Sequence, residues 1–254
     1  MNFEKFEKTA NPVIANPIEE KPTAEKKEPL NLQKISEEIS NEIKGSQGKT
    51  SNFFDIERSR YKKGINLSHR ITKSLMETEE REAGNFWDNL ENSFGNTFSD
   101  KNNDKKKDDF WKFKSWILST IAAMKILKET GCEVFLAPTK LDMENGIDLI
   151  ATKKRKVFGI QLKGKNLSSL RTERTKIEDL VSRPTKEYRK IMEKGVEILR
   201  TMCSKKRGIP FEKIELLMLT IPTGEEILTS NGNFRKQFKK KSLLLEALNN
   251  SMIA

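Results

Sequence analysis

Residues 145–165 read NGIDLIATKKRKVFGIQLKGK, and this stretch decides the fold. Two short apolar runs, residues 147–151 and 157–162, flank a basic tip at residues 153–156. Branched residues on both sides of a short polar connection predict a β-hairpin. The two hairpin strands are therefore expected to form part of a larger sheet.

Three polar side chains, Asp148, Gln161 and Lys163, interrupt these otherwise apolar strands. The alternation of a strand places Gln161 and Lys163 on one face. A carboxylate on one strand can then converge with an amide and an ammonium on its neighbour. Burying an acid and a lysine costs several kcal/mol unless they pair or hold an ion. The pattern indicates either a simple cross-strand ion pair or a functional site.

The series Gly-Ile-Asp, a spacer, and then Ile-Gln-Leu-Lys resembles the core motif of the PD-(D/E)xK nucleases. It is most similar to the branch in which glutamine replaces the motif acid, as in Mrr-type restriction endonucleases. The resemblance covers residues 110–165 well and residues 184–222 by pattern only. It implies an α/β fold with a restriction-endonuclease-like αβββαβ core, in which helices flank a central mixed sheet. It also implies a metal-dependent endonuclease that hydrolyses phosphodiester bonds in DNA, of the restriction, repair or recombination type.

The resemblance also implies roles for the motif residues. Asp148, Gln161 and Lys163 would be catalytic, with Mg²⁺ or Mn²⁺ as cofactor. Asp148 would anchor the ion, Gln161 would offer its side-chain carbonyl, and Lys163 would orient water or stabilise developing charge. Because the Gln161 amide carries no charge, a further acid is expected from the preceding loop, with Asp142 preferred over Glu144.

The chain departs from the family pattern in its first core helix. Related folds often carry a glutamate there, but residues 119–123 read STIAA, and Glu129 lies near the end of the helix. An alternative function is therefore a catalytically inactive nuclease-fold protein that binds nucleic acid or serves assembly. A third is an unrelated basic α/β protein whose amino-terminal arm docks a partner.

The positive charge of the chain is unevenly distributed. The formal net charge is +11, and residues 153–208 hold 18 Lys and Arg against 6 Asp and Glu. A local excess of this kind favours binding of a polyanion, and beside a nuclease-like motif it predicts nucleic acid, with DNA expected. A solvated basic face is the simpler interpretation. The candidate phosphate contacts are Lys165, Arg171, Arg174 and Lys176.

Composition excludes several classes. The sequence has no apolar run long enough to cross a membrane, and its first residues lack the apolar stretch of a signal peptide. With one histidine, His69, and no Cys-x-x-C pair, a zinc site or a histidine-based triad is not expected. We expect a cytoplasmic protein without membrane association.

The chain divides into three expected parts. Residues 1–50 are predicted to be a disordered tail with at most a short helix near residues 32–43. Residues 51–107 form a helical arm or cap that ends in a charged linker, and residues 108–254 form the nuclease-like domain. The arm at residues 51–98 would either cap that domain or dock a protein partner or a second copy.

The expected elements of the last part follow from periodicity and breakers. They are a helix from Asp108 that ends at Gly131, a strand at residues 132–137, a loop at 139–145, the hairpin, a helix capped by Thr185, a strand at 214–221 buried on both faces, and a helix at 233–249.

Overall fold

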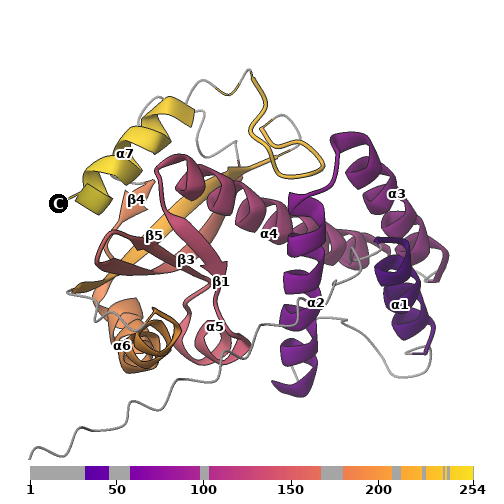
Figure 1. Ribbon diagram of the computed structural model, residues 1–254. Coiled ribbons are helices and arrows are strands. Elements are labelled where there is room, and N and C mark those ends of the chain that lie inside the picture. Colours follow the sequence, from indigo (N-terminus) through magenta and orange to yellow (C-terminus); the bar gives the residue numbers. More distant parts are fainter. Residues whose placement is uncertain are drawn as a thin grey trace, which may run out of the picture.

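The computed structural model describes residues 32–45, 58–97, 103–166, 180–207, 213–224, 227–236, 238 and 241–253. It shows an α/β protein with a five-stranded mixed sheet flanked by helices (Figure 1). In chain order the elements are α1 (Leu32–Gly45), α2 (Arg58–Met76), α3 (Glu80–Thr97), α4 (Asn103–Glu129), β1 (Glu133–Leu136), α5 (Thr139–Asn145), β2 (Leu149–Lys153), β3 (Lys156–Asn166), β4 (Val181–Ser182), α6 (Lys186–Arg207), β5 (Lys213–Thr223) and α7 (Lys241–Ile253). No helix within these residues is both long enough and apolar enough to traverse a bilayer.

The sheet has the strand order β1-β2-β3-β5-β4. Strands β1, β2 and β3 are antiparallel neighbours, and the expected hairpin is confirmed, with Leu149 opposite Ile160 and Lys153 opposite Lys156. Strand β5 returns parallel to β3 after α6, as the helical crossover predicts. The two-residue strand β4 pairs with β5 and was not predicted.

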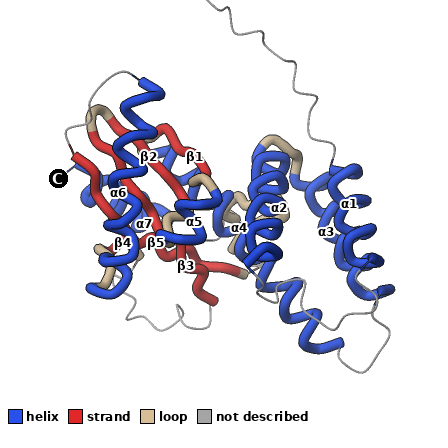
Figure 2. The backbone as a smooth tube through the Cα atoms, turned by 90° about the horizontal axis from the view of Figure 1, so that it is seen from below, coloured by secondary structure: helices blue, strands red, loops and turns tan. Residues whose placement is uncertain are grey.

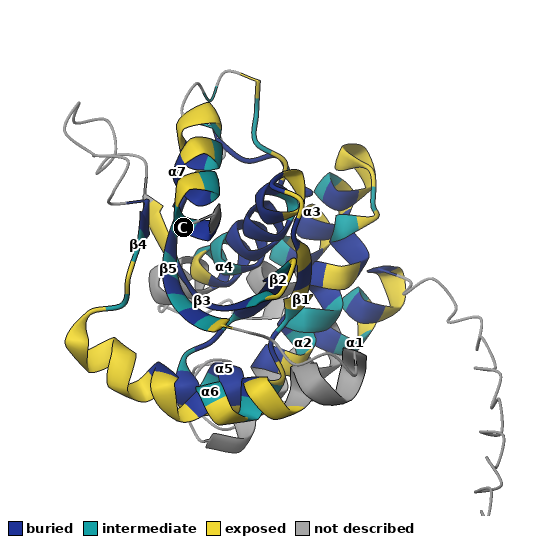
Figure 3. Ribbon diagram, turned by 60° about the vertical axis from the view of Figure 1, so that its left-hand side comes forward, coloured by how far each residue is buried: buried dark blue, intermediate teal, exposed yellow. Residues whose placement is uncertain are grey.

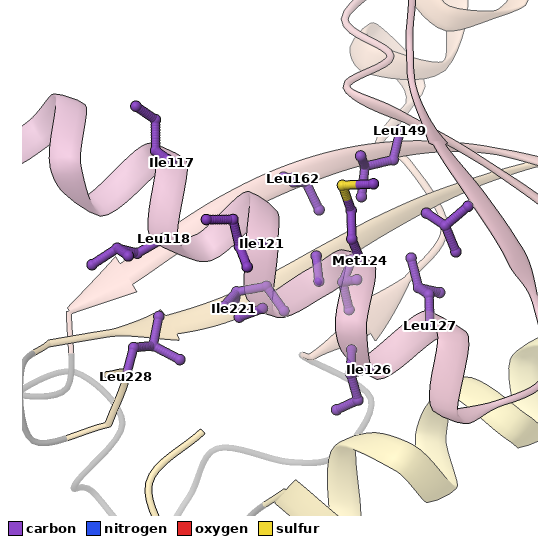
Figure 4. Close-up of a cluster of buried hydrophobic side chains, with 14 of the residues drawn as sticks. Ile117, Leu118, Ile121, Met124, Ile126, Leu127, Leu149, Leu162, Ile221 and Leu228 are labelled. Carbon is purple, nitrogen blue, oxygen red and sulfur yellow. The ribbon is translucent and has the colours of Figure 1, made fainter. Parts of the chain in front are cut away.

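Helix α4 lies across one face of the sheet and carries the main core. Its apolar side packs on inward residues of β2, β3 and β5, because alternate strand residues point to this face (Figure 4). The labelled side chains of this layer are Ile117, Leu118, Ile121, Met124, Ile126, Leu127, Leu149, Leu162, Ile221 and Leu228.

Helices α5 and α6 cover the opposite face of the sheet, as Figure 2 shows from below. A smaller apolar cluster fills this layer: Ala137, Leu141, Ile147, Ile150, Val157, Met192 and Leu199. The outward side of α6 is exposed (Figure 3). Along β5, residues 215, 217, 219 and 221 are buried, while residues 214, 216, 218 and 220 between and before them are half-buried. The prediction of a strand buried on both faces was therefore wrong, since α6 covers its side only in part.

The amino-terminal helices share the main core. Side chains of α1, α2 and α3 join those of α4 in one continuous apolar cluster. The indole of Trp87, on α3, is buried and donates a hydrogen bond from Nε1 to the carbonyl oxygen of Ser230 at 2.9 Å. This bond joins α3 to a turn far along the chain. The predicted helix near residues 32–43 is confirmed as α1, whereas residues 1–31 lie outside the described residues.

Three expected boundaries differ from the structure. Helix α4 begins at Asn103, so residues 103–109 are helical rather than a charged linker. Residues 139–145, predicted as a loop, form α5. The last helix begins at Lys241 rather than at residue 233, because residues 227–235 fold into a turn closed by an isolated bridge between Leu228 and Phe234.

Candidate active site

Helix α5 positions the first acid of the site. It follows Pro138 and ends at Gly146, whose φ of 60° lies in the left-handed region that favours glycine. The Gly146 N–H donates to the carbonyl oxygen of Asp142 at 3.0 Å and so closes the helix. The Asp142 side chain is buried, and its Oδ2 has no hydrogen-bond partner among the described residues. A buried carboxylate oxygen without a donor is costly, and a cation beside it would lower that cost.

The second acid, Asp148, is held at the entrance to β2. Its backbone N–H donates to Ile160 at 2.9 Å, and its carbonyl accepts from Ala137 at 3.0 Å. Its carboxylate accepts a hydrogen bond from the Leu162 N–H at 2.7 Å. Asp148 is thereby fixed to both neighbouring strands, with its side chain directed at the segment of β3 that carries Gln161 and Lys163.

The two acids line one small enclosed cavity. It measures about 10 Å³, which is at the lower limit for one water molecule or one ion. Helix α2 contributes His69, whose Nε2 lies 3.6 Å from Asp142 Oδ2. The lining residues are Ser68, His69, Thr72, Trp116, Ile117, Thr120, Leu136, Asp142 and Asp148. Helix α4 thus contributes Trp116, Ile117 and Thr120 to this cavity, and no carboxylate.

The surroundings of Asp148 disfavour its charged form. Burial is the largest cause and the neighbouring Asp142 carboxylate the second, and together they raise the pKa of Asp148 to about 7. The Leu162 N–H and the Lys163 ammonium act in the opposite direction and lower this pKa. Two acids held together in this way would gain from a cation placed between them.

Lys163 lies on β3 beside the site. It is near enough to Asp148 to lower the pKa of that carboxyl, in line with the predicted convergence of the two residues. Its Nζ donates to the Tyr188 hydroxyl at 3.3 Å and sits 4.4 Å from the centre of the Tyr188 ring. Tyr188, on α6, therefore restrains the ammonium by a hydrogen bond and a cation–π contact.

Gln161 is buried on the face of β3 that α5 and α6 cover. Its Nε2 lies 3.1 Å from the position that a Cβ on Gly146 would take, which places the amide at the junction of α5 and β2. Its Oε1 has no hydrogen-bond partner within the described part of the chain. Gln161 does not line the cavity that Asp142 and Asp148 share.

No family model, curated protein or solved structure matches the chain. The resemblance to PD-(D/E)xK nucleases therefore depends on the residues of the site and on the order of the elements. Among the predicted phosphate contacts, Lys165 is exposed on β3. Arg171, Arg174 and Lys176 lie outside the described residues.

Sequence reasoning missed His69 and Tyr188. As the single histidine, His69 was not expected to belong to a functional site, yet α2 brings it close to Asp142. Tyr188 was not among the residues that the sequence singled out for the site, although it contacts Lys163. Both contacts join elements distant in sequence, so spacing along the chain carried no signal for them.

The donor set fits a hard divalent ion. Mg²⁺ in proteins commonly takes one or two carboxylates and completes its shell with water. Asp142 and Asp148 supply two carboxylates, and Asp142 Oδ2 accepts no hydrogen bond within the described residues, with His69 Nε2 3.6 Å away. The described residues hold no group of three or more His, Cys, Asp or Glu side chains arranged for a metal. The two carboxylates would therefore supply only part of the coordination shell of a magnesium ion.

Proposed function

We propose that this protein is a Mg²⁺- or Mn²⁺-dependent nuclease that hydrolyses phosphodiester bonds, with DNA as substrate. The observation that supports this proposal most directly is the pair of carboxylates, Asp142 and Asp148, in one small cavity beside Lys163. Two neighbouring buried acids, one with an oxygen that accepts no hydrogen bond within the described residues, are costly alone and well suited to a divalent cation.

The order of elements supports the same proposal. Helix α4, strands β1, β2 and β3, helix α6 and strand β5 occur in the chain order that the resemblance implies, with α5 between β1 and β2 and β4 between β3 and α6. The candidate acid precedes β2, and the Gln-x-Lys series lies on β3, where the resemblance requires them. The basic region from residue 153 to 208 begins at this hairpin and suits a phosphate backbone.

Each residue of the site would have a distinct role. A bound divalent ion would supply an acidified water and neutralise phosphate oxygens. Asp148 and Asp142, which line the same cavity, would hold it. Lys163 would donate to the attacking water or to the charged transition state, an effect of about 3–4 kcal/mol for one well-placed donor. The Tyr188 contacts would keep that ammonium at the edge of the site.

Cleavage of plasmid and oligonucleotide DNA by the purified protein tests the proposal. With Mg²⁺ or Mn²⁺ present we expect cutting, which EDTA stops. Lys163→Ala should reduce the rate by at least about 100-fold, as loss of one transition-state donor does. Lys190→Ala removes the same charge from an exposed position on α6 and serves as the matched control. Cutting that survives Lys163→Ala at the wild-type rate would refute the assignment.

The second candidate function is a nuclease-fold protein that binds nucleic acid without cutting it. The observation that favours it is the contribution of α4 to the cavity, which contains no carboxylate. This function predicts salt-sensitive retention of DNA or RNA with no metal-dependent cleavage. The same assay therefore separates the two candidates.

A further inference from the structure

A second cavity lies at the carboxyl ends of β3 and β5. It is an open groove of about 490 Å³, within the range of roughly 300–1,000 Å³ typical of small-molecule sites. Its walls come from the first half of α4, from Gly164 of β3, and from the end of β5 with the turn that follows. The lining residues are Trp111, Lys112, Lys114, Ser115, Trp116, Leu118, Ser119, Gly164, Thr223, Gly224 and Leu228. Ligands of open α/β sheets commonly bind beyond the carboxyl ends of parallel strands.

The groove combines aromatic surface with positive charge. Two half-buried indoles, Trp111 and Trp116, line it. Lys114 is buried, and its Nζ lies 4.5 Å from the centre of the Trp111 ring and 5.8 Å from that of Trp87. Lys112 is exposed on the same wall. Indole surface beside ammonium groups suits a flat π-system that carries an anion, as a nucleobase with its phosphate does. An uncharged apolar side chain would gain nothing from the two lysines.

Trp116 connects the groove to the acid cavity. This one side chain lines both the groove and the cavity that holds Asp142 and Asp148. A base seated in the groove would therefore lie across the Trp116 side chain from the cavity that holds Asp142 and Asp148.

We propose that this groove binds an unpaired nucleobase of the strand that the acid site cleaves. The inference rests on the proposed function and adds a substrate class to it. A base can enter the groove only when it is unstacked, so the protein prefers DNA that contains an unpaired or displaced base over a fully paired duplex.

The test measures binding in EDTA, where cleavage plays no part. The probes are a fluorescent duplex with one unpaired central base and the same duplex fully paired. We expect wild-type protein to bind the first more tightly, and Trp111→Ala to weaken that binding by about tenfold or more while leaving the paired duplex unaffected. Trp111→Phe should keep most of the preference, because a phenyl ring still stacks. Phe135→Ala removes an exposed aromatic side chain from β1 and is the control. Thermal unfolding of each variant shows whether it is folded.

Three outcomes would overturn the inference. They are equal affinity of wild type for the two duplexes, equal loss of affinity for both in Trp111→Ala, and wild-type affinity in that variant. Occupancy of the groove by an apolar fluorescent probe that the unpaired duplex cannot displace would also contradict it. Cleavage without a preference for the unpaired base would leave the nuclease proposal standing and remove this one. A preference that depends on Trp111 in a protein that never cuts would remove the nuclease proposal and leave only the binding of an unpaired base by the groove.

Discussion

Replacing Asp148 by asparagine should stabilise the protein at alkaline pH. The folded protein raises the pKa of Asp148 from its ordinary value of 3.8 to about 7, chiefly by burial and then by the Asp142 charge. The folded state therefore binds a proton that the unfolded chain has already released between these two pH values. The favourable contribution of this proton is complete below about pH 4 and is lost as pH rises through about 7. Asparagine has the same shape and no proton to lose.

The size of the effect follows from the same shift. A change from 3.8 to about 7 corresponds to roughly 4 kcal/mol between the two protonation states, which is an upper limit. The amide oxygen can still accept the hydrogen bond that Leu162 donates to Asp148. We therefore expect Asp148→Asn to raise the free energy of unfolding by about 2–4 kcal/mol at pH 8, and by nearly nothing at pH 4.

Urea unfolding of both proteins from pH 4 to pH 8, followed by tryptophan fluorescence, measures this difference. Asp88→Asn, at an exposed position on α3, is the matched control and should show no such pH-dependent gain. The reasoning fails if the gain of Asp148→Asn is the same at every pH, or if this substitution destabilises the protein at pH 8. Either result would mean that the folded protein does not raise the pKa of Asp148.

Further substitutions test the site and the core. Adding Mg²⁺ at pH 8 should raise the melting temperature of the wild type and not that of Asp148→Asn, because only the wild type keeps both carboxylates; an equal rise in both would place the ion elsewhere. Gly232→Ala should lower the free energy of unfolding by about 2–4 kcal/mol in urea, since the φ of Gly232 is 73° and the new Cβ would come 2.7 Å from Ile121. Gly131→Ala is the control, because Gly131 is exposed and also has a positive φ, but a Cβ there meets nothing within 4 Å. This control should lose only the free energy needed to hold an alanine at positive φ. Trp87→Ala should cost about 3–5 kcal/mol, because it empties a buried site and removes the bond to Ser230; a loss below about 1 kcal/mol would show that α3 contributes little to the core.

The hairpin and the last strand could be predicted because their signals are local. Branched residues flank a basic tip in residues 147–162, and β5 is a nearly continuous apolar run. Helix α5 was missed because it is short and polar, so its composition resembles a loop. The start of α4 was missed for a related reason, since the charged residues 103–109 carry no apolar periodicity, yet they continue the helix.

The site could be predicted only in part, because it joins distant segments. The Asp148 and Lys163 pair was visible in the sequence, since strand alternation within one hairpin brings such residues together. The cavity also needs α2 and α4, which approach the hairpin only through tertiary packing. The contacts of His69 with Asp142 and of Tyr188 with Lys163 could therefore not be predicted from the sequence.

The shared core of α4 has a consequence for how the molecule opens. Helix α4 packs on the sheet and also on α2 and α3, so the amino-terminal helices and the sheet are buried against the same element. Amide hydrogens in α2 and α3 should therefore exchange with solvent in the same cooperative unit as those of β3 and β5, rather than ahead of them. If α2 and α3 formed a separate unit, their amide hydrogens would exchange earlier than those of the sheet. In this chain, loss of protection on one side of α4 should be accompanied by loss on the other.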